Sequence, residues 1–172
     1  MSILIPVVSR GVSFNEIPDR LSFYFEIGQC HAGCKGCHSP HLHEAIEKTT
    51  LEQMLTEADK AIDAGANAIV LMGGTTNDIS DNDLITIINK LAEIAPVGLY
   101  SGSDDTQHDL IIGEKSHLTW LKTGSYHEEL GGLTSPMTNQ RFFKKGMKYT
   151  IHHFQYPEVQ TMWEDCTQVF QT

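Results

Sequence analysis

Three cysteines crowded into one short segment are the residues of this chain best suited to chemistry. Cys30, Cys34 and Cys37 stand in 29–41, "QCHAGCKGCHSPH", with the spacing C-x3-C-x2-C, and the remaining cysteine, Cys166, lies far along the chain. Four cysteines could form two disulfides in a secreted protein. Because three of them are clustered, the pattern favours a shared metal site over disulfide bonds.

Two kinds of metal centre are compatible with these ligands. Structural zinc takes four protein ligands, and His38, His41 or His43 could complete a set with the cysteines. However, all candidates share one loop, and the usual zinc site has a second ligand pair well downstream. A [4Fe–4S] cluster held by three thiolates instead leaves one iron without a protein ligand, which suggests catalysis at the metal. The spacing favours this second centre, and zinc stays an alternative.

Length and composition limit the classes of protein that this chain can be. It has 172 residues, 40% of them hydrophobic, and a net charge of −10, which indicates one domain over 1–172. The densest basic stretch, 141–148, is too short to indicate nucleic-acid binding, and no apolar run approaches a membrane span. The apolar start is expected to be a strand and not a signal peptide, so we expect a cytoplasmic protein without nucleic-acid or membrane partners.

The cysteine loop is expected to follow a strand. Residues 20–28, "RLSFYFEIG", are aromatic-rich and partly alternate apolar with polar side chains, which predicts a strand. Residues 50–65 predict an amphipathic helix, in which Thr50 and Gln53 have the spacing of a capping box. The continuous apolar run 67–74, "NAIVLMGG", predicts a strand buried on both faces of a parallel sheet.

The alternation of strands and helices continues downstream. Asp81 is expected to cap a helix that ends before Pro96, and 97–102 predicts the next strand. A weaker helix over 104–112 and a strand over 117–124 complete the pattern. It predicts an α/β fold with a mainly parallel sheet, in which ligands bind at the carboxyl ends of the strands. The cysteine loop and the segments that follow the next two strands should meet at that edge.

The C-terminal part is expected to leave this pattern. Residues 141–154, "RFFKKGMKYTIHHF", predict a hairpin that turns at Gly146. After Pro157 the apolar residues recur at helical spacing, which predicts an amphipathic helix. Cys166 falls on the apolar face of this helix and is expected to be a buried small hydrophobe.

The cysteine segment resembles the cluster motif of the radical S-adenosylmethionine (SAM) superfamily. The stretch "CHAGCKGC" matches it, and Gly36 followed by "CHSP" is similar to the activating proteins of anaerobic (class III) ribonucleotide reductase. The resemblance extends to "LMGG", "LYSG" and "TGSYHEELGGLTSPMTNQRFF", in the expected order over about residues 3–150. It implies a partial (βα) barrel of the radical SAM type, followed by the hairpin and helix.

The resemblance also implies an activity. Cys30, Cys34 and Cys37 would hold a [4Fe–4S] cluster whose open iron binds SAM, with no catalytic residues beyond these ligands. An electron from a reduced flavodoxin or a ferredoxin-type donor would cleave SAM to a 5′-deoxyadenosyl radical. That radical would abstract hydrogen from a backbone glycine of the large subunit of anaerobic ribonucleotide reductase.

Residues after the second and third strands are the implied SAM contacts. Gly73, Gly74 and Thr75 would hold the methionyl part, and 100–102, which comprises Tyr100, Ser101 and Gly102, would lie near the ribose or carboxylate. The family usually has an acid where this chain has Thr75, and Asp78 could substitute for it. Two alternatives stay open. One is a radical SAM enzyme that acts on a small molecule, of the deazaguanine synthase type, and the other is a non-catalytic zinc or iron–sulfur module.

Overall fold

A computed structural model describes residues 2–35, 47–150 and 158–171 of the chain. Its main sheet has seven strands in the order β2-β3-β5-β6-β7-β8-β9. These strands are β2 (Val7–Ser13), β3 (Ser22–Ile27), β5 (Ala68–Met72), β6 (Val97–Tyr100), β7 (Leu118–Thr123), β8 (Arg141–Thr150) and β9 (Glu158–Asp165). The other elements are α1 (Leu51–Asp63), α2 (Asp81–Ala92), α3 (Thr106–Lys115), the 3-10 helix η2 (Thr167–Gln171), and a small sheet of β1 (Leu4–Ile5) and β4 (Thr49–Thr50).

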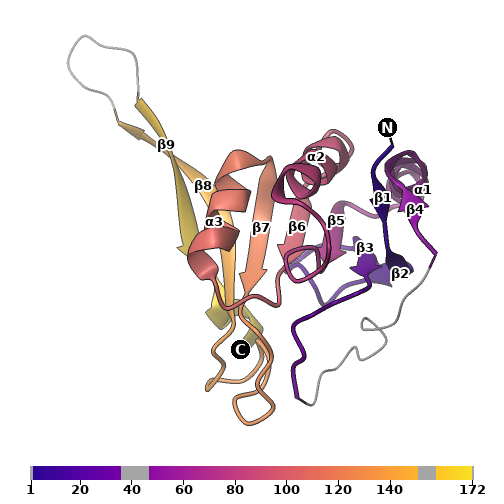
Figure 1. The fold of residues 1–172 in the computed structure, drawn as a ribbon. Helices are drawn as coiled ribbons and strands as arrows, with labels where there is room; N and C mark the ends of the chain where they lie inside the picture. Colours follow the sequence, from indigo (N-terminus) through magenta and orange to yellow (C-terminus); the bar gives the residue numbers. More distant parts are fainter. Residues whose placement is uncertain (1, 36–46, 151–157, 172) are drawn as a thin grey trace.

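The fold is mixed α/β, and the expectation of a mainly parallel sheet is correct only for its centre. The pairings β3–β5, β5–β6 and β6–β7 are parallel, whereas β2–β3, β7–β8 and β8–β9 are antiparallel. Parallel neighbours need a crossover connection. The helix α1 lies in the connection from β3 to β5, α2 in that from β5 to β6, and α3 in that from β6 to β7. Among the described strands, β2 and β9 are the two edges of an open sheet (Figure 1).

The predicted helices form close to where the sequence places them. Thr50 is the N-cap of α1, and the reciprocal bonds between Thr50 and Gln53 confirm the capping box. The N-cap of α2 is Ser80 and not Asp81, because the Ser80 hydroxyl accepts from the Asp83 amide while Asp81 is the first helical residue. The weaker helix over 104–112 is α3, which begins at Thr106 and extends to Lys115.

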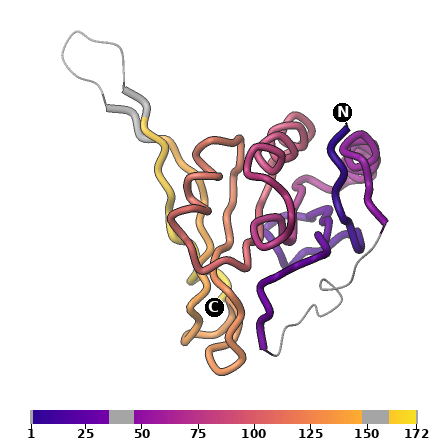
Figure 2. Tube along the Cα trace, in the orientation of Figure 1, coloured from indigo at the N-terminus to yellow at the C-terminus, as the bar shows by residue number. Residues whose placement is uncertain are grey.

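The helices cover one face of the sheet, and loops and the C-terminal 3-10 helix cover the other (Figures 1 and 2). Apolar side chains of alternate strand positions, such as Phe25, Leu71 and Leu99, pack with those of the helices in the larger core. The intervening positions form a smaller core on the helix-free face, where Val70, Trp120 and others pack. Because the central strands are buried on both faces, they carry continuous apolar runs.

The C-terminal predictions need two corrections. The hairpin exists as β8 and β9, but its turn is not at Gly146, which lies within β8 opposite Met162. The segment after Pro157 is a strand and then a short 3-10 helix, not an amphipathic helix. The open edge of β8 offers a full ladder of backbone partners, and this pairing outweighs the helical spacing of the apolar residues. Cys166 is half-buried against the smaller core, and burial raises the pKa of its thiol.

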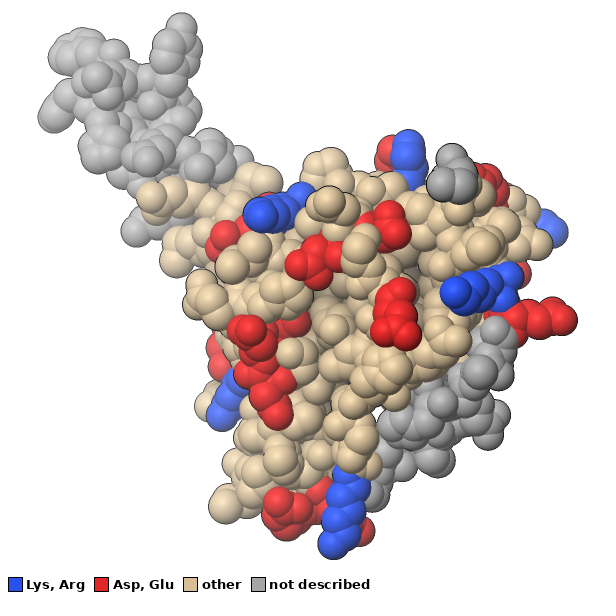
Figure 3. Space-filling model, viewed as in Figure 1, with Lys and Arg blue, Asp and Glu red and all other residues tan. Residues whose placement is uncertain are grey.

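The surface charge follows the acidic composition of the chain. On the face shown in Figure 3, Asp and Glu side chains are dispersed over the described residues, and Lys and Arg side chains stand apart from one another. Within 2–35, 47–150 and 158–171, no helix has both the length and the apolar character that crossing a membrane requires.

Candidate functional site at the carboxyl edge of the sheet

Four strands place one side chain each in a row on the helix-free face. Glu26 is in register with Met72, Met72 with Tyr100, and Tyr100 with Lys122. These residues end β5 and β6 and stand one residue before the ends of β3 and β7. The loops that follow β3 and β7 project from the same edge of the sheet (Figures 1 and 2). A pocket of about 310 Å³ lies between this row and these loops.

The cysteine loop begins at this pocket. Cys30 and Cys34 are half-buried, and both line the pocket. The Cys30 Sγ atom lies 3.1 Å from Thr76 Oγ1, and the His31 amide donates to the Thr76 carbonyl at 2.7 Å. The loop after β3 is therefore attached to the loop after β5.

The third predicted ligand lies outside the described residues. Cys37, Gly36 and the three histidines at 38, 41 and 43 fall in the range 36–46. Within the described ranges, no three His, Cys, Asp or Glu side chains are grouped so that they could hold a metal ion. The described part of the chain thus supplies two thiols of the predicted set of three.

The glycine-rich turn after β5 is fixed by a buried asparagine. Gly73 and Gly74 have φ angles of 109° and 126°, which residues other than glycine rarely adopt. The Asn77 Oδ1 atom accepts from the Gly74 amide at 2.7 Å, and its Nδ2 donates to the carbonyls of Ile27 and Gly28. Asn77 therefore joins the ends of β3 and β5. The sequence patterns assigned no role to this residue.

The predicted SAM contacts separate into two groups. Gly73 lines the pocket, and so do the residues at and after the end of β6, which are Tyr100, Ser101 and Gly102. Gly74 is buried against Leu84 of α2, and Thr75 directs its hydroxyl to Ser101, with 2.6 Å between the two oxygens. Neither Gly74 nor Thr75 is part of the pocket lining.

Asp78 lies away from the pocket. Its side chain is 77% exposed and pairs with His31 on the outer side of the cysteine loop, at 3.1 Å between Oδ1 and Nε2. It lines no part of the pocket. The carboxylates that line the pocket are Glu16 and Glu26, and sequence reasoning missed both.

The floor of the pocket combines these carboxylates with an aromatic ring and an ammonium. The Tyr100 hydroxyl donates to the backbone carbonyl of Glu16, and burial together with the Glu16 charge raises the pKa of Tyr100 well above its usual range. The Lys122 Nζ atom lies 5.3 Å from the centre of the Tyr100 ring. Burial raises the pKa of Glu16, and a bond from Ser13 and the charge of Lys122 oppose this rise. Glu26 and Lys122 are charged residues at strand positions that face inward. That pattern in the sequence could have identified the floor of the pocket.

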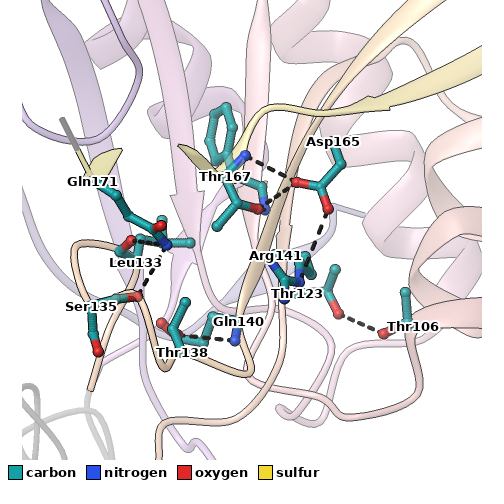
Figure 4. Close-up of polar contacts among 11 residues, drawn as sticks. Thr106, Thr123, Leu133, Ser135, Thr138, Gln140, Arg141, Asp165, Thr167 and Gln171 are labelled. Atoms are coloured by element: carbon teal, nitrogen blue, oxygen red, sulfur yellow. Dashed lines mark hydrogen bonds and ion pairs between the residues drawn. The ribbon is translucent and has the colours of Figure 1, made fainter. Parts of the chain in front are cut away.

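The loop between β7 and β8 forms a further wall. Gly124, Tyr126, Gly132 and Gln140 line the pocket from this loop, and Gln140 Nε2 donates to the Gly124 carbonyl at 3.2 Å. The C-terminal segment holds the loop in place (Figure 4). Its contacts include Gln171 Nε2 with the carbonyls of Leu133 and Ser135, and Asp165 with Thr167 and Arg141.

Comparisons of the chain with family models, with curated proteins and with solved structures find no match.

The donor atoms at the pocket are of the kind that an iron–sulfur cluster takes. The thiols of Cys30 and Cys34 line the pocket together with Gly73, Gly102 and Gly124, which follow the ends of β5, β6 and β7. A volume of about 310 Å³ falls within the range of small-molecule sites. Thiolates are the ligands that iron–sulfur clusters prefer.

Proposed function

We propose that this protein is a glycyl-radical activating enzyme of the radical SAM type, with a partial (βα) barrel, and that it serves an anaerobic ribonucleotide reductase. One observation carries the proposal. Cys30 and Cys34, on the loop after β3, line the same pocket as the strand-end residues Gly73, Ser101 and Gly102. The two described cysteines of the motif and the glycine-rich segments named by the resemblance therefore share one pocket.

The residues of the site would hold the two cofactors. Cys30 and Cys34, with Cys37 from the sequence, would ligate the [4Fe–4S] cluster. When bound, the reduced cluster with SAM supplies the one-electron cleavage that yields a 5′-deoxyadenosyl radical. Gly73 would let the backbone approach the methionyl group, because a Cβ there would come within 3.2 Å of Asn77 and Ile27. Tyr100, Ser101 and Gly102 would line the same pocket.

The remaining residues position and shield the ligand. Asn77 keeps the glycine-rich turn in place, and the loop over 124–140 walls the pocket on the side away from the cysteines. Such enclosure limits side reactions of a radical with water. The proposed partners are the large reductase subunit, which carries the glycine, and a flavodoxin or ferredoxin-type electron donor. The proposed compartment is the cytoplasm, where thiols stay reduced.

The test is an anaerobic assay on the full chain. After reconstitution with iron and sulfide, reduction and addition of SAM, we expect 5′-deoxyadenosine and methionine as products. Cys30→Ser and Cys34→Ser should lose both the cluster and the products. Cys166→Ser is the matched control, since Cys166 lies against the smaller core and not at the pocket, and it should retain both.

Two outcomes would favour the alternatives. Colourless protein that binds zinc and takes up no iron would overturn the radical proposal in favour of a zinc module. SAM cleavage without a glycyl radical on the reductase, judged by electron paramagnetic resonance, would overturn the activase assignment and favour a small-molecule substrate.

A further inference from the structure

A nearly buried side-chain amide stands in the wall of the pocket with only one of its two ends bonded. Gln140, the residue before β8, is 3% exposed and lines the pocket. Its Nε2 atom donates to the Gly124 carbonyl at 3.2 Å, whereas its Oε1 atom accepts from no donor in the described part of the chain. Buried polar groups normally have hydrogen-bond partners, so this oxygen calls for one.

The oxygen can be reached from the pocket. The Oε1 atom of Gln140 lacks a partner, yet it is not among the side-chain atoms that the described residues seal from solvent. A Cβ built on Gly132, which also lines the pocket, would have this Oε1 atom as its nearest contact, at 3.7 Å. The absence of a side chain at Gly132 therefore leaves room beside the acceptor.

The orientation of the Gln140 amide follows from its partner. A carbonyl oxygen can only accept, so the Gln140 atom next to the Gly124 carbonyl has to be the nitrogen. The backbone is held as well, because the Gln140 amide donates to Thr138 Oγ1 at 3.0 Å and the Thr138 hydroxyl donates to the Gly131 carbonyl at 3.2 Å (Figure 4). The Oε1 atom is thus a fixed acceptor.

This wall suits a neutral group that only donates. With Nε2 held by Gly124, Gln140 offers a ligand an acceptor and no donor. A hydroxyl group would also need partners for its own lone pairs, whereas an amino group on an aromatic ring donates and does not accept. A cationic group would be held better by the carboxylates that line the pocket, those of Glu16 and Glu26.

We propose that Gln140 is a specificity-determining residue of the pocket, whose Oε1 atom accepts a hydrogen bond from the exocyclic amino group of an aminopurine. The inference rests on the proposed function, in which SAM brings this group on its adenine. A 6-oxopurine would place a second acceptor against Oε1 and leave both oxygens without a donor. The pocket should therefore discriminate against it.

Matched pairs of nucleosides test this contact without turnover. S-adenosylhomocysteine and S-inosylhomocysteine carry an amino and an oxo group at purine position 6, and 5′-methylthioadenosine and 5′-methylthioinosine repeat the difference without the amino-acid head. Affinities are measured by anaerobic calorimetry on the reconstituted full chain. In the unchanged protein, we expect the adenosyl member of each pair to bind about tenfold more tightly. Gln140→Met should bind both members of a pair equally.

Two further variants support the comparison. Gln107→Met, at an exposed position of α3, is the matched control and should keep the preference of the unchanged protein. Gly132→Ala keeps Gln140 but fills the space beside Oε1, so it should weaken binding of the adenosyl compounds about tenfold. A loss of folded protein would affect both members of a pair alike, so the ratio of their affinities reports on the contact itself.

The outcomes separate this inference from the proposed function. Equal affinity of the unchanged protein for both members of a pair, or an undiminished preference in Gln140→Met, would overturn the inference and leave the proposed function intact. In the second case Gln140 would only hold the loop. An unchanged protein that binds none of these compounds would also overturn the inference, and if it failed to cleave SAM as well, the proposed function would fall with it.

Discussion

The Sγ atom of Cys30 lies 3.1 Å from the Oγ1 atom of Thr76, although the two residues belong to loops that follow different strands. The backbone supports the same contact, since the His31 amide donates to the Thr76 carbonyl at 2.7 Å. Parallel pairing of β3 with β5 brings these loops together at one edge. A thiol that is proposed to bind metal therefore has its hydroxyl partner in place.

This contact predicts the effect of Thr76→Val on metal retention. Partners that hydrogen-bond to metal ligands typically contribute about 10- to 100-fold in affinity. We expect the reconstituted variant to lose half of its iron at a chelator concentration about tenfold lower than the unchanged protein does. Thr56→Val, at an exposed position of α1, is the control, and it should retain iron as the unchanged protein does. Equal iron retention in Thr76→Val would show that the hydroxyl does not support the thiolate.

Asn77 predicts a large effect on stability. Replacement by alanine leaves the buried Gly74 amide and the carbonyls of Ile27 and Gly28 without their partner. We expect Asn77→Ala to lower the free energy of unfolding by about 3 kcal/mol, as unsatisfied buried groups do. Urea unfolding measures it, with Asn82→Ala on the exposed side of α2 as the control. A loss no larger than that of the control would contradict this role.

Much of the central fold could be predicted from local patterns. Residues 68–72 are apolar throughout because β5 is buried on both faces. The capping box at Thr50 and Gln53 marks the start of a helix through its own hydrogen bonds. Carboxyl ends of parallel strands share one edge, so the meeting of the cysteine loop with Gly73 and Ser101 also followed from element order.

The remaining features depend on contacts between distant segments. The helical spacing after Pro157 did not predict β9, because the strand exists only through its ladder with β8. Glu16 reaches the pocket from the turn between β2 and β3, which no local pattern places under the cysteine loop. Asp109 stands in the helix with the weakest sequence signal, and only packing of α3 on β6 and β7 buries it.

A close contact between α3 and β9 predicts that Gly113 has no room for a side chain. A Cβ at Gly113 would come within 2.5 Å of the Trp163 ring, whose indole nitrogen is buried. Alanine normally favours a helix by about 1 kcal/mol over glycine, but overpacking costs about 1 to 3 kcal/mol. We therefore expect Gly113→Ala to lower the melting temperature.

The matched control for this contact is Gly146→Ala in β8. A Cβ there would have its nearest heavy atom, the Met162 carbonyl oxygen, at 3.8 Å. This variant should unfold at the same temperature as the unchanged protein or slightly above it. If Gly113→Ala were as stable as Gly146→Ala, α3 and Trp163 would not be packed as described.

The buried acid predicts an unusual dependence of stability on pH. Folding raises the pKa of Asp109 from 3.8 to about 6, so the native chain binds more protons than the unfolded chain between these values. The contribution of this group to stability therefore falls as the pH rises through that window and stays low above it. Asp109→Asn removes the free-energy cost of burying the ionised carboxylate, which is about 3 kcal/mol for a pKa raised by about two. In urea unfolding, the variant should be more stable than the unchanged protein at pH 7, and the difference should vanish below pH 3.8. A difference that is constant across this range would contradict the burial of an ionised Asp109.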